Sequence, residues 1–389
     1  MPGAVRVAVV GTGNIARAHA QALAELNAAA GASPAATIVA VMDTDDTQLS
    51  SFMEEFEVPA GYRQLTDLLS AGRPDLVHIC TPPAAHYPVA LGCLRAGVSV
   101  LVEKPPTISL REFDALTAAE SQRGGHRAPP WFATVFQHRF GSGQRRLKAL
   151  AASGVLGRPL LALCHTTWFR DQAYFDVPWR GRWDTEGGGP TMGHGIHQMD
   201  MLLDVLGEWT EVSALARTQA RKTDTEDLSL AHVTFASGAV ASVVNSVLSP
   251  REESYLRFDF EHATIELTHL YGYDDNDWRI TPAPGRDEEI LAAWEHADSA
   301  TASGRSNSGG PAVSPAGRTG HAAQFAQVLA ALRDGRRPPV GPAQARGTLS
   351  LAAGIYASAF ARRPVTPDYL APGTPFYQHM NGPMDGGTA

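Results

Sequence analysis

A short apolar strand runs directly into a glycine turn near the start of the chain, and this feature constrains the fold most. Residues 6–10 read RVAVV, and Gly11, Gly13 and Ala16 follow in the pattern Gly-x-Gly-x-x-Ala. The first glycine permits a tight bend, the second lets the backbone approach a pyrophosphate, and a small third residue lets helix and strand pack closely. The helix beginning at Asn14 offers unpaired N–H groups to phosphates. The pattern predicts a dinucleotide site formed by Gly11, Thr12, Gly13, Asn14 and Ile15.

An acidic residue ends the next apolar strand, at residues 37–42. The carboxylate of Asp43 can accept hydrogen bonds from both ribose hydroxyls of a dinucleotide. Gly13 and Asp43 are further apart than the usual spacing of about 20 residues, and we assign the excess to a loop at residues 27–36. Residues 43–46 read DTDD, with no Arg to hold a 2′-phosphate. The sequence therefore predicts NAD rather than NADP.

Strands and helices alternate through the first third of the chain. Further buried strands are expected at residues 75–80 and 98–102, with helices at 67–71 and 87–96. Parallel strands need crossover connections, and right-handed crossovers place helices on both faces of the sheet. We therefore expect an α/β Rossmann domain over residues 1–128.

The pattern changes after residue 128. Several later strands alternate with period two, as in a sheet with one buried face. This predicts an α+β domain with a large, mostly antiparallel open sheet over residues 129–389, for substrate binding and oligomerisation. Because a large exposed apolar face is normally buried against a partner, we expect a homodimer or homotetramer through this sheet. Residues 298–318 are rich in Ser, Gly, Ala and Pro, which predicts a flexible loop. The expected strands are residues 131–136, 159–165, 229–235, 240–246, 256–260 and 264–267.

Charge and cysteine content exclude several classes of protein. The 389 residues include 32 Lys and Arg against 40 Asp and Glu, a net charge of −8, which argues against a nucleic-acid surface. Cys80, Cys93 and Cys164 form no CxxC pair. We find neither a signal-peptide pattern nor an apolar run long enough to span a membrane. A cytoplasmic location without membrane or nucleic-acid partners is expected.

Two polar motifs directly follow strands of the expected parallel sheet. Thr81, Pro82 and His86 follow one strand, and Glu103 and Lys104 follow the next. The carboxyl ends of parallel strands form the edge where open α/β sheets hold ligands. A Lys beside a cationic nicotinamide has its ammonium form disfavoured, which suits proton transfer near neutral pH.

In these motifs the chain resembles the Gfo/Idh/MocA family, the glucose-fructose oxidoreductase and inositol dehydrogenase type. The resemblance covers residues 5–365. It implies an NAD-dependent oxidoreductase that moves hydride between nicotinamide and a secondary alcohol or ketone of a sugar, sugar derivative or cyclitol. The motifs that carry it are GTGNIA at residues 11–16, TPPAAH at 81–86, EKP at 103–105 and GGGPTMGHGIHQMD at 187–200.

The resemblance also implies roles for individual residues. Lys104 matches the family's catalytic lysine and His197 its catalytic histidine. The chemistry agrees with these roles. An imidazole with an unperturbed pKa of about 6.5 suits a general base that takes the substrate hydroxyl proton. An ammonium group stabilises the negative charge that develops on that hydroxyl oxygen. The cofactor is expected along the glycine turn, Asp43, Thr81, Pro82, His86, Glu103 and Lys104, with Trp179 and Arg180 at its nicotinamide end.

Residues 168–183, WFRDQAYFDVPWRGRW, are dense in aromatic and Arg side chains. Aromatic faces and fixed hydrogen-bond donors suit a sugar ring, whose C–H face is apolar and whose edge is polar. The expected substrate-binding residues are Lys104, Trp168, Arg170, Tyr174, Trp183, His194 and His197.

One position departs from the family pattern. Members often carry an Asp four residues before the histidine, on the same helical face, but this chain has Gly193. His194 would point about 100° away along a helix. The role of that carboxylate is therefore either empty or filled from elsewhere in the chain, with Asp184, Glu186 and His138 as equal candidates.

The histidine motif also has a spacing that metal ligands can adopt on a helix. His194, His197 and Asp200 recur at a spacing of three. A zinc site needs at least three convergent ligands with supporting contacts, and a nicotinamide enzyme already explains the histidine. We therefore expect no metal.

Two other functions remain open on sequence. A glycoside-cleaving enzyme that retains NAD would oxidise a sugar hydroxyl transiently, eliminate an aglycone and reduce the product. A non-catalytic NAD-dependent sensor or regulator would use the same scaffold. The presence of both Lys104 and His197, and the lack of a basic patch, weigh against the sensor.

Overall fold

The computed structural model describes residues 3–31, 33–121, 129–302 and 320–382, and the chain divides into two compact units. The division differs from the expected boundary at residue 128, because the chain passes between the units more than once. Unit 1 comprises Met1–Thr107, Glu112–Phe136 and Gly320–Ala345, and unit 2 comprises Ile108–Arg111, Gln137–Thr319 and Arg346–Ala389.

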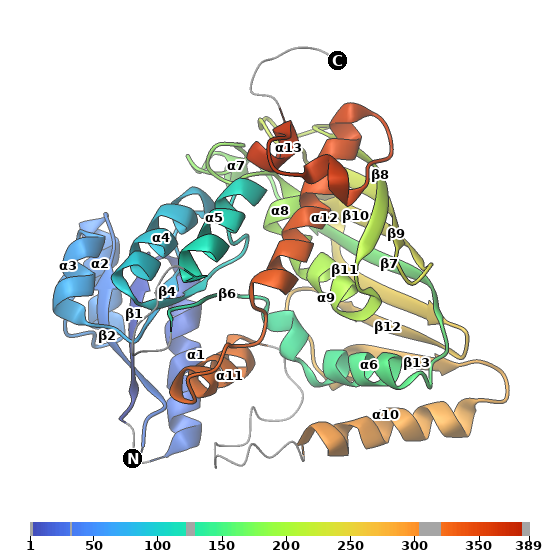
Figure 1. The fold of residues 1–389 in the computed structure, drawn as a ribbon, viewed down its shortest axis with the longest axis horizontal. Helices are drawn as coiled ribbons and strands as arrows, with labels where there is room; N and C mark the ends of the chain where they lie inside the picture. The colour runs from blue at the N-terminus through green and yellow to red at the C-terminus, as the bar shows by residue number, and fades with distance from the viewer. Residues whose placement is uncertain (1–2, 32, 122–128, 303–319, 383–389) are drawn as a thin grey trace. The chain divides into compact units, whose positions relative to one another are not determined.

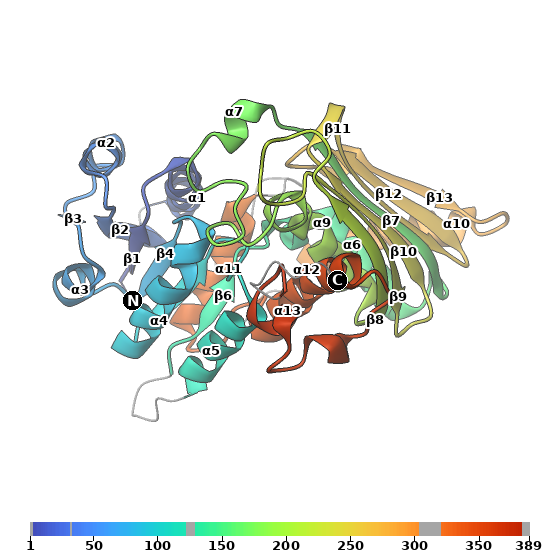
Figure 2. The same ribbon diagram turned by 90° about the horizontal axis from the view of Figure 1, so that it is seen from above.

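Unit 1 is built on a six-stranded sheet in the order β3-β2-β1-β4-β5-β6. Every pair in it is parallel, which confirms the Rossmann prediction. Figures 1 and 2 show α1 and α4 on opposite sides of this sheet. The strands are β1 (Val5–Val10), β2 (Ala36–Met42), β3 (Gly61–Tyr62), β4 (Leu76–Ile79), β5 (Ser99–Val102) and β6 (Phe132–Thr134). The longer helices are α1 (Asn14–Ala30), α2 (Asp46–Glu55), α4 (His86–Ala96), α5 (Leu110–Ser121) and α11 (His321–Arg333).

The core of unit 1 explains why two late segments belong to it. Val7 of β1 is buried in a cluster with Leu23 of α1, Ala133 of β6 and Phe325 of α11. Residues 131–136 and the helix from residue 321 were expected in the second domain. They lie here because β6 extends the parallel sheet beside β5 and α11 packs its apolar side against α1. Figure 1 shows α1 and α11 side by side.

Unit 2 is built on a seven-stranded sheet in the order β13-β12-β11-β7-β10-β9-β8. Only the β7–β10 pair is parallel among these strands, which confirms the mostly antiparallel prediction. The strands are β7 (Pro159–Phe169), β8 (Trp209–Arg217), β9 (Leu228–Phe235), β10 (Val240–Ser246), β11 (Leu248–Phe260), β12 (Ala263–His269) and β13 (Trp278–Pro282).

Helices cover one face of the unit 2 sheet. In Figure 1, α8 and α9 lie over it, and α6 packs beside α9. The other face carries exposed apolar side chains, among them Leu161, Leu215, Leu230 and Val240. The helices of this unit are α6 (Ser142–Ser153), α7 (Gln172–Phe175), α8 (Pro190–Gly193), α9 (Ile196–Leu206), α10 (Asp287–Ala302), α12 (Pro342–Ala361), whose first residues lie in unit 1, and α13 (Pro375–Gln378).

Some local predictions need correction. The helix expected at 67–71 is a short α3 (Leu65–Asp67) followed by a π-helical turn, Leu68–Gly72. Residues 298–302 of the expected loop continue α10, and 303–318 lie outside the described residues. The tail after residue 363 contains two short helices, Pro367–Leu370 and Pro375–Gln378. Within the described part of the chain, no helix combines the length and apolar character needed to span a bilayer.

Candidate active site

The glycine turn has the shape needed to receive a dinucleotide. Gly11 has φ of +85°, and a Cβ there would lie 2.7 Å from the Cys80 carbonyl oxygen, so only glycine fits. A Cβ at Gly13 would meet no neighbouring atom within 4 Å, which leaves room for a phosphate to approach. Gly13 is the N-cap of α1 and provides no side-chain cap. The first N–H groups of α1 are therefore available to an anion.

Asp43 braces this turn. Its Oδ2 accepts hydrogen bonds from the backbone N–H of Thr12 at 2.7 Å and from the Thr12 hydroxyl at 2.8 Å, while its Oδ1 accepts from the Asp45 N–H at 3.0 Å. A carboxylate offers about four lone-pair sites, so Asp43 retains capacity for a ribose hydroxyl. The placement at the end of β2 agrees with the prediction.

The other acidic residues after β2 have structural roles that the sequence did not reveal. Asp45 caps α2 by accepting from the N–H groups of Thr47 and Gln48 at 2.8 and 3.0 Å. Asp46 pairs with Arg63, which follows β3. The absence of Arg from residues 43–46 is therefore only a local property, because β3 brings an arginine to this acidic segment.

The two strand-end motifs are linked through His86. Its Nδ1 lies 2.7 Å from the Pro105 carbonyl oxygen and its Nε2 lies 2.8 Å from the Thr81 carbonyl oxygen. Burial lowers the pKa of His86, although these backbone contacts oppose the shift. The Thr81 hydroxyl is buried without a hydrogen-bond partner among the described residues. An unsatisfied hydroxyl at this edge fits a bound cofactor.

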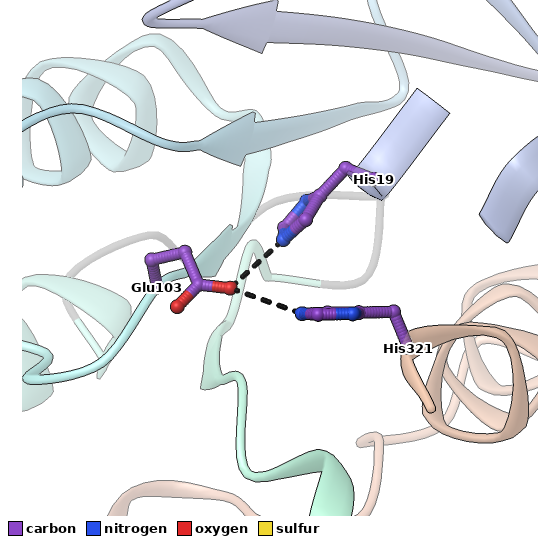
Figure 3. A group of neighbouring side chains, drawn as sticks. All are labelled: His19, Glu103 and His321. Atoms are coloured by element: carbon purple, nitrogen blue, oxygen red, sulfur yellow. Dashed lines mark hydrogen bonds and ion pairs between the residues drawn. The ribbon is translucent and has the colours of Figure 1, made fainter. Parts of the chain in front are cut away.

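Glu103 turns its carboxylate toward two imidazoles, the buried His19 and the partly buried His321 (Figure 3). Its Oε1 lies 2.9 Å from His19 Nε2 and 3.4 Å from His321 Nε2, and its Oε2 accepts from the Lys104 backbone N–H at 3.0 Å. Burial alone would raise the pKa of Glu103, but the hydrogen bonds and charges of the two imidazoles bring it well below its usual value. This carboxylate therefore holds the backbone from which the Lys104 side chain projects.

His19, Glu103 and His321 also form the convergent His/Cys/Asp/Glu group found in the described part of the chain, with ligand atoms within 4.8 Å of one another. Hydrogen bonds account for the contacts within it. His194, His197 and Asp200, which recur at a spacing of three in the sequence, do not form such a group in the described part of the chain. Asp200 instead accepts from Arg139 at 2.5 and 2.7 Å and from the Thr348 hydroxyl at 2.9 Å.

In unit 2, His197 lies in the first turn of α9 and is buried. Its ring stacks on His138 with centroids 4.7 Å apart and planes at 12°, and Tyr271 meets it edge-on at 6.0 Å. The expectation that residue 193 shares a helical face with His197 is wrong, because α8 ends at Gly193 and α9 begins at Ile196. His194 lies at the break, with φ of −122°.

Most of the expected substrate-binding residues of unit 2 gather in one aromatic–arginine cluster, which comprises Trp168, Arg170, Tyr174, Trp179, Arg180 and His194. Arg170 lies 5.1 Å from the Trp168 ring and 5.7 Å from the Tyr174 ring. Arg180 lies 4.0 Å from the Tyr174 ring and 4.2 Å from the Trp179 ring. His194 contacts Trp168 and Tyr174, with ring centroids 5.2 and 5.8 Å apart. The aromatic–arginine cluster thus brings aromatic ring faces and guanidinium hydrogen-bond donors together.

Trp183 does not join this cluster. Its indole N–H donates to the Asp224 carbonyl oxygen at 2.8 Å. Its ring packs edge-on against Tyr356 and Phe360, at 5.1 and 5.8 Å. Trp183 therefore packs against α12 and makes no ring contact with the members of the cluster among the described residues.

The two carboxylates just before the glycine run differ sharply. The Asp184 side chain is 65% exposed and pairs with Arg182 at 2.9 Å. The Glu186 side chain is 5% exposed, and its Oε1 lies 3.2 Å from Arg180. Its Oε2 accepts from the Gly181 N–H at 2.7 Å. Sequence reasoning did not separate the two.

Unit 1 is a dinucleotide-binding domain, because its parallel sheet carries this glycine turn. Lys104 follows β5, which pairs with the strand that precedes Thr81. These features together are typical of an oxidoreductase. Residues 5–126 match the model of the Gfo/Idh/MocA oxidoreductase family, described as an NAD-binding Rossmann fold, and residues 144–266 match the family's C-terminal domain. The chain belongs to the Gfo/Idh/MocA family.

The chain is also similar to proteins that are named as sugar dehydrogenases. The chain is 26% identical over 300 residues to D-glucoside 3-dehydrogenase of Escherichia coli, covering 71% of this chain and 80% of the relative. It is 28% identical over 299 residues to UDP-N-acetylglucosamine 3-dehydrogenase of Acidithiobacillus ferrooxidans, covering 74% and 82%. Among solved structures, the WlbA dehydrogenase of Chromobacterium violaceum with NADH and UDP-GlcNAcA has a TM-score of 0.77 at 25% identity, covering 94% and 96%.

Proposed function

We propose that this protein is an NAD-dependent dehydrogenase that oxidises a secondary alcohol, or reduces the matching ketone, of a sugar, sugar derivative or cyclitol. One observation carries the proposal: Lys104 follows β5, directly beside the strand that leads to Thr81 and its unsatisfied hydroxyl. The Lys104 ammonium group, the proposed catalytic cation, thus belongs to the same edge of the sheet as the proposed cofactor contacts. The names of the relatives support a carbohydrate substrate.

The cofactor-binding groups proposed in unit 1 act through backbone and polar contacts. The N–H groups at the start of α1 hold the pyrophosphate, and Asp43 accepts from the ribose. Thr12 fixes the Asp43 carboxylate. NAD is preferred over NADP because the Asp43 carboxylate would repel a 2′-phosphate, and Arg63 is already paired with Asp46. The remaining proposed contacts are Gly11, Gly13, Asn14, Ile15, Thr81, Pro82, His86, Glu103 and Lys104, and in unit 2 Trp179 and Arg180.

The chemistry of the chain's own residues is proton transfer and charge stabilisation. His197 takes the hydroxyl proton in oxidation and returns it in reduction. Lys104 donates a hydrogen bond to the same oxygen as negative charge develops there. A bound nicotinamide supplies the hydride acceptor. Trp168, Arg170, Tyr174 and His194 present the aromatic faces and donors that orient the ring.

The exposed face of the unit 2 sheet supports a homodimer or homotetramer. Leu161, Leu215, Leu230 and Val240 are each 38 to 47% exposed on strands β7 to β10. An apolar sheet face of this kind is normally buried against another subunit. The three cysteines are free and buried, which suits a reducing compartment and a cytoplasmic location.

A substrate panel tests the proposal. Purified protein with NAD is offered methyl glucosides, free hexoses, inositols and UDP-N-acetylglucosamine, and formation of NADH is followed by absorbance. We expect at least one member to be oxidised. Cofactor that copurifies tightly, with substrate cleaved and no NADH released, would identify the glycoside-cleaving reaction instead. Binding of NAD without turnover of any member would identify a sensor.

A further inference from the structure

The Glu186 carboxylate lies beside Gly193, four residues before His197. The space next to this glycine could hold a side chain. A Cβ built on Gly193 would meet Glu186 Oε1 at 3.6 Å and nothing else outside its local backbone within 4 Å. Gly193 is not in the left-handed backbone region. Glycine is therefore not required there for conformational reasons, and a carboxylate from elsewhere in the chain occupies the adjacent space.

The backbone around Glu186 fixes this carboxylate in place. Oε2 accepts from the Gly181 N–H at 2.7 Å, and Arg180 lies 3.2 Å from Oε1. Gly187, the next residue, has φ of +79°, and a Cβ on Gly189 would lie 1.9 Å from the Glu226 carbonyl oxygen. Glycine is therefore needed at both positions, and the contacts with Gly181 and Arg180 hold the Glu186 carboxylate at the start of this glycine run.

The surroundings of Glu186 belong to the aromatic–arginine cluster. Arg180, its ion-pair partner, also bonds the Tyr174 hydroxyl and stacks on the Tyr174 ring. Burial raises the pKa of Tyr174 to about 12, so this hydroxyl is neutral at physiological pH. His194, which directly follows Gly193, contacts the same ring. Glu186 is therefore a buried hydrogen-bond acceptor next to the aromatic–arginine cluster, whose ring faces and donors suit a sugar ring.

We infer that Glu186 is a substrate-binding and specificity-determining residue, whose carboxylate accepts a hydrogen bond from a sugar or cyclitol hydroxyl other than the one oxidised. The inference rests on the proposed function. A fixed, acceptor-only group selects ligands that present a hydroxyl donor at that point. Asp184 does not fit this role because it is exposed and held by Arg182.

The test moves the carboxylate from one position to the other. Glu186→Gln is expected to lower kcat/KM for the best substrate of the panel by about 10- to 100-fold, the size of a lost hydrogen bond to a charged group, with the KM for NAD unchanged. In the Glu186→Ala background, adding Gly193→Asp is expected to recover at least about tenfold over adding Gly193→Ala. Asp184→Asn is the matched control and is expected to behave as wild type.

Glu186→Gln with wild-type kcat/KM overturns the inference, and so does equal activity of the Gly193→Asp and Gly193→Ala double variants. A purely structural role for Glu186 predicts equal activity of the two double variants, because an aspartate at position 193 would not restore the contacts with Gly181 and Arg180. Thermal unfolding identifies any variant that fails to fold, and Glu186→Gln alone then decides. If wild type oxidises nothing in the panel, the proposed function fails and the inference fails with it, whereas an active wild type with fully active Glu186→Gln refutes the inference alone.

Discussion

The imidazoles of His138 and His197 stack face to face, with centroids 4.7 Å apart and planes at 12°. They come from different elements, since His138 lies in the 3-10 turn Gln137–Phe140 and His197 in α9. Tyr271 meets both rings edge-on. The proposed general base is thus held flat against a second aromatic ring, which restricts the tilt of its imidazole.

His138→Ala is expected to lower kcat by about tenfold, because a general base that can tilt spends less time aimed at the hydroxyl proton. His138→Phe keeps a flat ring in the stack and is the matched control, expected to retain most of the activity. Steady-state kcat for both variants is the measurement. Equal activity of the Ala and Phe variants with wild type would show that the stack does not position His197.

Lys104→Ala is expected to lower kcat by at least about 100-fold, since it removes the group that stabilises charge on the reacting oxygen. The Lys104 side chain is only partly buried, so the thermal unfolding temperature is expected to stay near that of wild type. Near-wild-type turnover of this variant would contradict the assignment of Lys104.

Asp43→Ala is expected to raise the KM for NAD by about tenfold or more, because the ribose loses its acceptor and Thr12 loses both bonds to the carboxylate. Asp45→Ala, two residues on, is the control. It removes the N-cap of α2 and is expected to cost about 1 kcal/mol of stability, with the KM for NAD unchanged. The reverse pattern would assign the ribose contact to Asp45.

The buried imidazoles beneath Glu103 predict a fall in stability on acidification. Burial holds the pKa of His19 below its usual value and that of His78 well below it, so both bind a proton less readily in the folded chain than in the unfolded chain. The unfolded chain binds protons at these positions below about pH 6.5. The free energy of unfolding is therefore expected to decrease as the pH falls below that value.

Glu103 adds to this fall at lower pH. Its folded pKa is depressed, so its stabilising contribution is present above the unfolded carboxyl pKa of about 4.3 and is lost as the pH falls further. Urea unfolding at several pH values measures both effects. His78→Gln is expected to flatten the upper part of the curve, and an unchanged slope would exclude this histidine as a cause.

The sequence predicted the elements whose signals are local. The glycine turn, the position of Asp43 and the strand-end motifs each follow from a few adjacent residues, and the structure has them at the expected places. Contacts between distant segments were not accessible in this way. Arg63 reaches Asp46 only because β3 lies beside β2, and Arg139 reaches Asp200 across 61 residues.

Packing partners were also hidden. The residues of α11 do not by themselves show that this late helix packs beside α1 in unit 1. Trp183 looked like its neighbours in an aromatic-rich stretch, yet it packs on α12. Glu186 and Asp184 are two positions apart, yet Glu186 is buried beside Arg180 and Asp184 is exposed beside Arg182, a difference that no local sequence pattern reveals.

The most direct test of the central claim is the fate of the hydrogen on the oxidised carbon. The best substrate of the panel, deuterated at its carbinol carbon, is incubated with NAD, and the nicotinamide product is analysed by mass spectrometry. Direct hydride transfer predicts one deuterium in the released NADH and a ketone in place of the alcohol. Product formation with no deuterium in the nicotinamide would contradict it.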